Sequence, residues 1–362
     1  MVLNMKVAFI TIHVGLNFGS ILQTIATSEL LKKKGCDSIC INYWPPRTTN
    51  KRYWQGALKS FSKFLWRALY FPLRVISENR FSHYLSRHCL VSKRLYNDGN
   101  YLKKLPVADV YMSGSDQIWN YEHNEGIDGH YFFEGVKGRK ISLSSSIGLT
   151  AVSDEYAAYL KKALKEYTAI SVREESAVDL LHNLGVGAQQ LTDPTLALNK
   201  SEWFPFSTNR LVKEKYLFVY LPYNTINKSI IYETARKIAN NQKLLIVTYS
   251  TNIFTDKFAD RTIKWCNPGD ILSLILYSEY VITNSFHGTA FSINLNKQFW
   301  VYMPSNFSTR ISSLLRLCNL ENRLLEAVIE DGELERKICF DFTNSVLAGE
   351  RQKTMDFLNK LF

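Results

Sequence analysis

Short apolar runs alternate with helix-period segments along most of the chain, and this alternation limits the fold more than any other feature. Strands separated by helices of this length pair in parallel, so the pattern predicts an α/β protein with a parallel sheet in each half. Strands are expected at residues 6–12, 38–43, 107–112, 140–143, 169–172 and 189–192, and in the second half at 216–221, 243–249, 280–282 and 298–303.

The length of 362 residues suits two domains of ordinary size. We expect an N-terminal domain over residues 1–192, a C-terminal domain over 193–345 and a C-terminal helix over 346–362. Residues 194–215 lack a clear period and are expected to link the domains. Two such domains that face each other leave a cleft, and ligands usually bind in such a cleft.

A histidine stands where one predicted strand turns into a helix. The run 280–282 leads into a helix-like run over 290–294 through Thr283-Asn284-Ser285-Phe286-His287-Gly288-Thr289. Ligands of open parallel sheets bind at such turns, and the amino end of a helix favours an anion. Imidazole exchanges protons near neutral pH. His287 is therefore expected either to transfer protons beside a phosphate or carboxylate, or only to cap the turn.

The segment 47–94 combines cationic and bulky apolar side chains, with eleven Lys or Arg and a single acid, Glu78. We expect a helical insertion over about 47–95. It could lie on an anionic membrane surface, bind nucleic acid, or form a solvated helical pair whose aromatic residues face the core. No nucleic-acid-binding motif accompanies it, so no nucleic-acid partner is expected.

Composition and absent motifs exclude several classes of protein. No stretch reaches membrane-spanning length without a charge, the first apolar run is too short for a secretion signal, and six scattered cysteines indicate free thiols in a reducing cytosol. The motifs G-x-x-x-x-G-K-[ST], G-x-S-x-G and Asp-x-Asp are absent, and no G-x-G-x-x-G follows the first strand. We expect a cytoplasmic protein without a metal site or a bound cofactor.

Several short motifs occur in a fixed order, and their residues are Asn17-Phe18-Gly19, Leu22-Gln23, Gly114-Ser115-Asp116-Gln117-Ile118-Trp119, Ser144-Ser145-Ser146-Ile147-Gly148, Ser171-Val172-Arg173-Glu174-Glu175-Ser176, Thr192-Asp193-Pro194-Thr195 and Ser285-Phe286-His287-Gly288. In this order and spacing the set resembles the polysaccharide pyruvyl transferase family, over roughly residues 6–320. The resemblance implies a fold like that of type B glycosyltransferases, with two Rossmann-like domains whose parallel sheets face a cleft. It also implies transfer of a pyruvyl group from phosphoenolpyruvate to a sugar, usually as a ketal. Some relatives carry Arg-Leu-His at the last motif, and that arginine is missing here.

The resemblance also points to residues for the donor. The family's motif histidine is regarded as catalytic and falls on His287, and its motif arginine falls on Arg173. Arg173 follows a predicted strand, and a guanidinium grips a phosphate or carboxylate with two prongs. The alternative for Arg173 is an ion pair with Glu174, Glu175 or Asp179.

Three further residues are expected on the donor side. Ser285 and Gly288 belong to the same turn as His287. Arg310 follows the next predicted strand, so it either completes the anion site or serves as a surface or domain-clamping arginine.

The acceptor is expected to contact two loops of the N-terminal domain. Gly19 lets the backbone approach a ligand, and Asn17 either bonds sugar hydroxyls or caps a helix. Asp116 could act as a base toward the acceptor or cap a turn, and Trp119 could stack on a sugar face. The expected acceptor residues are Asn17, Phe18, Gly19, Ser115, Asp116 and Trp119.

We therefore expect a transferase that moves a pyruvyl group from phosphoenolpyruvate to a sugar of a surface polysaccharide or of its lipid-linked precursor. A lipid-linked acceptor would explain the basic aromatic segment, because the enzyme must then reach the inner membrane face as a peripheral protein. Two alternatives stay open. One is a nucleotide-sugar-dependent glycosyltransferase of the same architecture, and the other is a non-catalytic sugar- or membrane-binding module.

Overall fold

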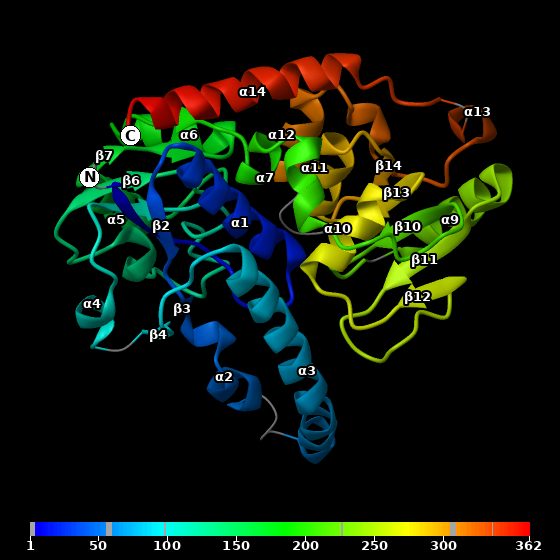
Figure 1. Ribbon diagram of the computed structural model, residues 1–362, viewed down its shortest axis with the longest axis horizontal. Coiled ribbons are helices and arrows are strands. Elements are labelled where there is room, and N and C mark those ends of the chain that lie inside the picture. The colour runs from blue at the N-terminus through cyan, green and yellow to red at the C-terminus, as the bar shows by residue number, and fades with distance from the viewer. Residues whose placement is uncertain (1–3, 56–59, 98, 226, 305–308, 335) are drawn as a thin grey trace. The chain divides into compact units, whose positions relative to one another are not determined.

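The computed structural model describes residues 4–55, 60–97, 99–225, 227–304, 309–334 and 336–362. The chain divides into two compact units (Figure 1). The N-terminal unit comprises residues 1–197 together with 352–362, and the C-terminal unit comprises 198–351. The first boundary falls after residue 197 rather than the expected 192 because helix α7 (Pro194–Ala197) packs against helix α1 (Phe18–Lys33) of the N-terminal unit.

A five-stranded parallel sheet forms the centre of the N-terminal unit, with strand order β2-β1-β5-β6-β7. In β1 the four residues Val7 to Ile10 are fully buried, as expected for a central strand that is covered on both faces. The strands are β1 (Lys6–Ile10), β2 (Asp37–Cys40), β5 (Val110–Ser113), β6 (Arg139–Ser142) and β7 (Tyr167–Ala169).

The side chain of Asn17 fixes the start of the first helix. Its Oδ1 accepts hydrogen bonds from the backbone N–H groups of Gly19 at 3.0 Å and Ser20 at 3.3 Å. Such a cap satisfies amides that have no partner inside the helix. The apolar period of the sequence predicts a helix from residue 21 to residue 34, whereas the cap makes α1 begin at Phe18. The other helices of this part are α4 (Tyr101–Lys104), α5 (Asp154–Leu164) and α6 (Glu175–Asn183), and a short parallel pair joins β8 (Ser171–Val172) to β9 (Gln189–Gln190).

The basic aromatic segment lies between two short strands that pair in parallel, β3 (Tyr43–Trp44) and β4 (Leu95–Tyr96). Its described residues form α2 (Asn50–Gln55) and the long helix α3 (Phe61–His88). The sequence-based expectation of a helical insertion covers this region, and residues 56–59 within it lie outside the described part.

The C-terminal unit contains a second five-stranded parallel sheet, with order β12-β11-β10-β13-β14. The parallel sheet predicted for each half is therefore confirmed. The strands are β10 (Tyr216–Tyr220), β11 (Leu245–Tyr249), β12 (Arg261–Ile263), β13 (Tyr280–Thr283) and β14 (Gln298–Val301), and the helices are α8 (Lys200–Trp203), α9 (Lys228–Gln242), α10 (Pro268–Leu276), α11 (Phe286–Asn294), α12 (Thr309–Leu317) and α13 (Asp331–Leu334).

The last helix, α14 (Asp341–Asn359), begins before the expected residue 346. Its residues from 352 onward belong to the N-terminal unit. Two polar contacts fix this end of the chain, because Lys34 Nζ donates to Asn359 Oδ1 and Arg139 Nη1 donates to the Leu361 carbonyl at 2.9 Å. Over the described residues, no helix has both the length and the apolar content needed to cross a bilayer.

The end of α14 should stabilise the N-terminal unit through apolar burial. The side chain of Leu358 is fully buried, so Leu358→Ala should lower the free energy of unfolding by about 2–5 kcal/mol. Urea unfolding measures this loss. Lys360→Ala, at an exposed position on the next turn, is the matched control and should change stability by less than about 0.5 kcal/mol. Equal losses of stability in the two variants would contradict a stabilising role for the buried side chain of Leu358.

Candidate active site

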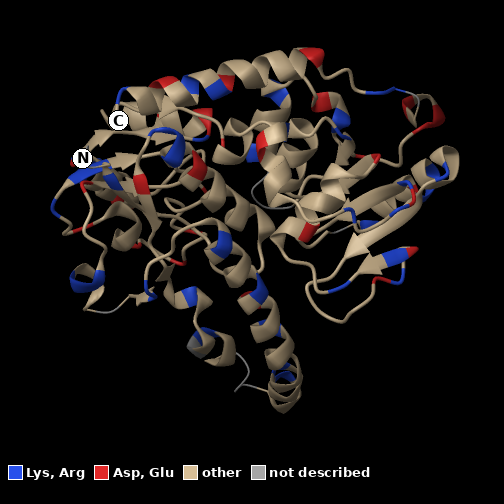
Figure 2. Cartoon of the chain, viewed as in Figure 1, with Lys and Arg blue, Asp and Glu red and all other residues tan. Residues whose placement is uncertain are grey.

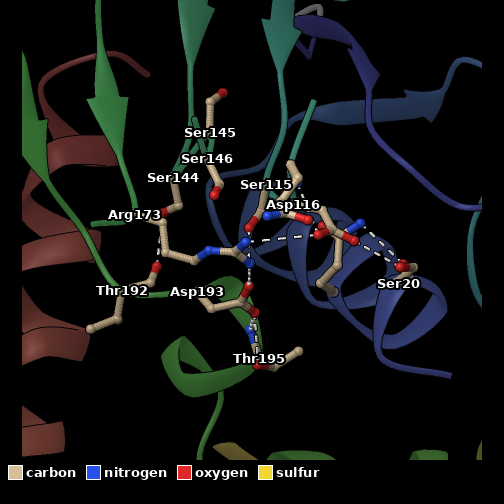
Figure 3. A network of polar contacts seen from close by, with 12 residues as sticks. Ser20, Ser115, Asp116, Ser144, Ser145, Ser146, Arg173, Thr192, Asp193 and Thr195 are labelled. Carbon is tan, nitrogen blue, oxygen red and sulfur yellow. Dashed lines mark hydrogen bonds and ion pairs between the residues drawn. The ribbon is translucent and has the colours of Figure 1, made fainter. Parts of the chain in front are cut away.

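Polar side chains gather where the strands of the N-terminal sheet end (Figure 3). Single bridges pair Asp116 with Ser145 and Ser145 with Val172, so parallel pairing recurs three residues beyond the ends of β5 and β6. These bridges hold the segments after β5 and β6 beside strand β8. Because the carboxyl ends of parallel strands meet at one edge, residues far apart in the chain are brought together there.

Asp116 links the end of β5 to the start of α1. Its carboxylate accepts hydrogen bonds from Ser20 Oγ at 2.7 Å and from the backbone N–H of Gln117 at 2.9 Å. The backbone of Asp116 is left-handed, with φ of 72°, which aspartate tolerates better than most residues. The carboxylate is thus held by donors from a strand end and a helix start.

The guanidinium of Arg173 lies inside a group of three carboxylates, of which Figure 3 shows Asp116 and Asp193. Its Nη1 is 2.5 Å from Asp193 Oδ2, its Nη2 is 3.7 Å from Asp116 Oδ1, and its Nε is 3.9 Å from Glu174 Oε2. Burial alone would lower the pKa of Arg173, but the surrounding carboxylates raise it above its usual value. A buried cation held in this way is ionised and fixed in position.

The carboxylates around Arg173 also accept neutral donors. Asp193 Oδ2 accepts from Ser115 Oγ at 3.1 Å, and Asp193 Oδ1 accepts from the backbone N–H and the hydroxyl of Thr195 at 2.9 and 2.7 Å. Glu174 Oε1 accepts from Ser146 Oγ at 3.0 Å and from the backbone N–H of Gly148 at 2.5 Å. One guanidinium thus faces three carboxylates in this cluster.

Of the residues expected to contact the acceptor, the structure brings Ser115 and Asp116 together with Arg173, and it places Asn17 and Gly19 at the start of α1. Phe18 is fully buried. Asn17 does cap the helix, which was one of its two expected roles, and contact with a sugar stays a prediction for these residues.

Trp119 belongs to the hydrophobic core of the N-terminal unit. Its side chain has an exposed fraction of 0%, its ring stacks on Phe132 at 5.4 Å, and its Nε1 donates to the Tyr131 carbonyl at 3.3 Å. Both ring faces and the indole N–H are thus within the core. The expected stacking of Trp119 on a sugar therefore finds no support in its position.

A second histidine, His13, follows the first strand and was not among the expected site residues. Its Nδ1 lies 3.1 Å from the Thr11 carbonyl, and its Nε2 lies 3.1 Å from Asn42 Oδ1, which also accepts from Trp44 Nε1 at 2.8 Å. Burial lowers the pKa of His13, and the contacts with Asn42 and Thr11 oppose that shift. Its place directly after a strand is the signal that could have identified it, because His287 was singled out on the same ground.

In the C-terminal unit the turn from β13 to α11 is built by two short polar side chains. Thr283 Oγ1 donates to the Tyr220 carbonyl at 2.8 Å and accepts from the backbone N–H of Ser285 at 3.1 Å. Ser285 is the N-cap of α11, and its Oγ accepts from the backbone N–H of Gly288 at 3.3 Å. The expected turn between a strand and a helix is present, and Ser285 has a structural role within it.

Gly288 allows α11 to approach β13 closely. A Cβ atom at this position would lie 2.3 Å from Thr283 Oγ1 and 3.0 Å from Thr283 Cβ, which is closer than non-bonded atoms can approach. Close packing therefore explains the glycine at residue 288. A contact of Gly288 with the donor stays a prediction.

His287 lies in the first turn of α11 and is nearly fully buried. The Phe286 ring contacts His287 edge to face at 5.2 Å between centroids, and the Arg310 guanidinium carbon lies 5.4 Å from the centre of the same ring. Arg310 extends from the start of α12 and is itself buried. The structure thus places a guanidinium near the amino end of α11, where the helix dipole also favours an anion. Such a place can bind an anion and move a proton beside it.

Two units, each with a parallel five-stranded sheet and polar residues at strand ends, define a fold of the type B glycosyltransferase class. A UDP-N-acetylglucosamine 2-epimerase from Rickettsia bellii has a similar structure, with a TM-score of 0.52 and 10% identity over 99% of this chain and 97% of that one. The Anabaena Alr3699/HepE protein in complex with UDP and glucose gives a TM-score of 0.49 and 8% identity over 99% and 100% of the two chains.

The model of the family described as polysaccharide pyruvyl transferase matches residues 17–306. The chain belongs to this family, and the family resemblance inferred from the motifs is therefore confirmed. No curated protein matches the chain.

The charges around Arg173 should be essential for the stability of the N-terminal unit. Asp193→Ala should lower the free energy of unfolding by about 3–5 kcal/mol, because it leaves a buried guanidinium without its nearest carboxylate. Asp179→Ala, at an exposed position on α6, is the control and should cost less than about 0.5 kcal/mol. Chemical denaturation of both variants measures the difference, and a small loss for Asp193→Ala would contradict the proposed importance of the cluster.

The contact between α11 and β13 provides a second test in the C-terminal unit. Gly288→Ala places a methyl group against Thr283 and should lower the free energy of unfolding by about 1–3 kcal/mol. Gly349→Ala provides the matched control, because Gly349 lies in α14 with no atom within 4 Å of an added Cβ. That change should be neutral or stabilising by up to about 1 kcal/mol. Thermal unfolding compares the two variants, and the same sign of effect in both would refute the steric explanation.

Proposed function

We propose that this protein transfers a pyruvyl group from phosphoenolpyruvate to a sugar of a surface polysaccharide or of its lipid-linked precursor, and that the product is a ketal. Membership of the polysaccharide pyruvyl transferase family supports the class of reaction. The observation that carries the choice of site is the placement of His287 and Arg310 around one aromatic ring at the amino end of α11. A proton carrier and a fixed cation are what an anionic enol ester requires.

The proposed reaction balances without a cofactor or a metal ion. A proton adds to the methylene carbon of phosphoenolpyruvate, and the positive charge that develops at C2 is attacked by one sugar hydroxyl. The C2–O bond to phosphate then breaks, and a second hydroxyl of the same sugar attacks C2 to close the ketal. Of the two hydroxyl protons released, one replaces the proton given to the methylene carbon and the other leaves with phosphate.

In this proposal the C-terminal unit binds the donor. His287 delivers the proton to the methylene carbon and is recharged by a proton from an attacking hydroxyl. Arg310 and the amino end of α11 hold the phosphate or the carboxylate, since a guanidinium can bind either in a two-pronged manner. Ser285 and Gly288 shape the turn on which His287 lies.

Donor binding by Arg173 stays a prediction. To bind the donor, the guanidinium of Arg173 would have to exchange contacts that it already makes with carboxylates. The guanidinium is already held by Asp193 and lies near Asp116 and Glu174. A phosphate that approached this guanidinium would also meet these three carboxylates, which disfavour its binding. We therefore propose that Arg173 primarily positions Asp116.

In the same proposal the N-terminal unit binds the acceptor. Asp116 accepts the proton of the other attacking hydroxyl and passes it to the departing phosphate, and Asn17, Gly19 and Ser115 orient the sugar. Asp116 is suited to this role because Ser20 and the Gln117 amide fix the orientation of its carboxylate. A lipid-linked acceptor would place the enzyme at the cytoplasmic face of a membrane.

The proposal predicts a large loss of activity when His287 is replaced. His287→Gln should lower kcat by about 10²–10⁴-fold. Arg310→Gln should mainly raise the KM for phosphoenolpyruvate by about tenfold or more, because the charged hydrogen bond between the guanidinium and the anionic substrate is lost. The assay couples phosphate release to a gain of mass on a water-soluble glycoside. His182→Gln, at an exposed position of α6, should leave both quantities unchanged.

Binding experiments separate the proposed reaction from its alternatives. Saturable binding of phosphoenolpyruvate without binding of uridine or guanosine diphosphate sugars supports the pyruvyl transferase. Transfer from a nucleotide sugar in the absence of phosphoenolpyruvate would instead establish a glycosyltransferase. Folded His287→Gln protein with full activity would refute the role of the histidine, and folded wild-type protein that binds sugar but forms no product would favour a non-catalytic module.

A further inference from the structure

Helix α3 changes character along its length. Its buried residues are Ser77, Phe81, Tyr84 and Leu85, and all of them lie in the second half of the helix. The helix contacts α1 of the same unit, whereas its first half extends away from the N-terminal sheet (Figure 1). About four turns of helix are therefore outside the core of the N-terminal unit.

One face of this outer half is covered by α2. The Trp54 ring lies 5.7 Å from Phe64 and 5.3 Å from Phe71, and the Tyr53 ring lies 5.8 Å from Phe71. The guanidinium of Arg67 lies over the Tyr53 ring at 5.1 Å. These contacts agree in part with the expected helical pair, because α2 partly covers some of the aromatic residues of the segment, although Phe64 stays exposed.

The opposite face of α3 carries a stripe of exposed apolar side chains. Phe61 is 81% exposed and Leu69 is 68% exposed, and Leu65, Trp66 and Ile76 are exposed as well. Residues 61, 65, 69 and 76 recur at helical spacing and lie on one side of the helix, with Trp66 beside them. A contiguous apolar stripe of this kind on a water-soluble surface marks an interaction site. These five residues are the apolar stripe of α3.

Positive charge follows the apolar stripe along the same side of the helix. Arg80 and Arg87 are exposed and continue the spacing from Ile76. The only acid of α3, Glu78, is paired with Arg74 at 2.7 Å. Figure 2 shows Lys and Arg recurring along α2 and α3. The surface is thus apolar at one end and cationic at the other, and no acid within α3 is left to offset the charge.

This combination matches an anionic lipid surface better than a second copy of the chain. The acyl region of a bilayer accepts the apolar side chains, and its anionic headgroups attract the arginines. Aromatic side chains such as Trp66 favour the boundary between the two regions. A second copy would bring the same cations and a formal net charge of +11, and such charge opposes self-association.

We propose that the apolar stripe of α3 inserts shallowly into an anionic bilayer while Arg80 and Arg87 bind its headgroups. This inference deepens the proposed function, because a lipid-linked acceptor would lie in the same membrane. It also rests on a surface distinct from His287 and Arg310, so the two proposals can fail separately. The helix then serves as the membrane-facing element of the N-terminal unit.

The test is co-sedimentation of the full chain with vesicles of phosphatidylcholine, with and without phosphatidylglycerol, in the absence of substrates. We expect binding to the anionic vesicles that weakens as salt is added. The double variant Leu65→Gln/Leu69→Gln should weaken binding at least tenfold, because two inserted apolar side chains are lost. Arg80→Gln/Arg87→Gln should weaken it by about 20-fold or more, at about fivefold for each charge.

Matched control variants test whether the loss of any exposed apolar or cationic side chain, rather than one on α3, weakens vesicle binding. Phe204→Gln/Phe342→Gln removes two exposed apolar side chains elsewhere in the chain, and Lys213→Gln/Lys257→Gln removes two exposed cations of the C-terminal unit. Each control should bind vesicles within about twofold of the wild type, as expected for surface changes away from the contact. Thermal unfolding should be similar for all of these variants, because each changed side chain is exposed.

Three results would overturn the proposal. The first is unchanged vesicle binding by the Leu65/Leu69 variant, and the second is equal binding to neutral and anionic vesicles. The third is a wild-type dimer in gel filtration that the Leu65/Leu69 variant abolishes, which would assign the stripe to a second copy. Activity on a water-soluble glycoside reports separately on the reaction. A variant that loses vesicle binding but keeps this activity supports docking through α3 and leaves the transferase proposal intact.

Discussion

The buried guanidinium of Arg173 controls how the carboxyl edge of the N-terminal sheet is built. Three carboxylates surround it, and two of them belong to segments that follow other strands. Without a cation among them, each buried carboxylate would cost several kcal/mol in lost hydration. The single positive charge therefore holds together the ends of β5 and β8 and the segment after β9. Through Asp116 and Ser20 the same network reaches the start of α1.

The C-terminal unit organises its strand end by different means. Its turn between β13 and α11 depends on short neutral contacts, namely the hydroxyl of Thr283, the cap formed by Ser285 and the missing side chain of Gly288. None of these three contacts involves a carboxylate, whereas three carboxylates lie near Arg173. This difference supports the proposal that an anionic donor binds at the amino end of α11.

The sequence predicted the two parallel sheets well, because strand and helix periods are local properties of the chain. For the same reason it placed His287 correctly at the junction of a strand and a helix, although α11 begins at Phe286 and so includes the histidine. It could not identify the partners of Arg173, since Asp116 and Asp193 are distant in the chain and meet Arg173 only through the sheet. Three acids close to Arg173 in the sequence were expected as possible partners, namely Glu174, Glu175 and Asp179. Of these, Glu174 forms an ion pair with the guanidinium.

Two other differences have similar causes. Trp119 follows a strand end in the sequence, yet its burial depends on Phe132 and Tyr131, which no local pattern could place beside it. Helix α1 begins before its first periodic apolar residue because a side-chain cap rather than periodicity sets its start. The local sequence thus predicts the secondary-structure position of a side chain. Tertiary contacts decide whether that side chain is exposed at a site or buried in the core.

The α2–α3 segment leaves and re-enters the fold at neighbouring points, because β3 pairs with β4 in the register Tyr43 to Leu95. The outer half of the hairpin can therefore be lengthened, shortened or exchanged during evolution without moving the strands of the main sheet. Proteins that share this scaffold could bind at different places in the cell through changes in the α2–α3 segment alone, without any change in the position of the residues at the strand ends.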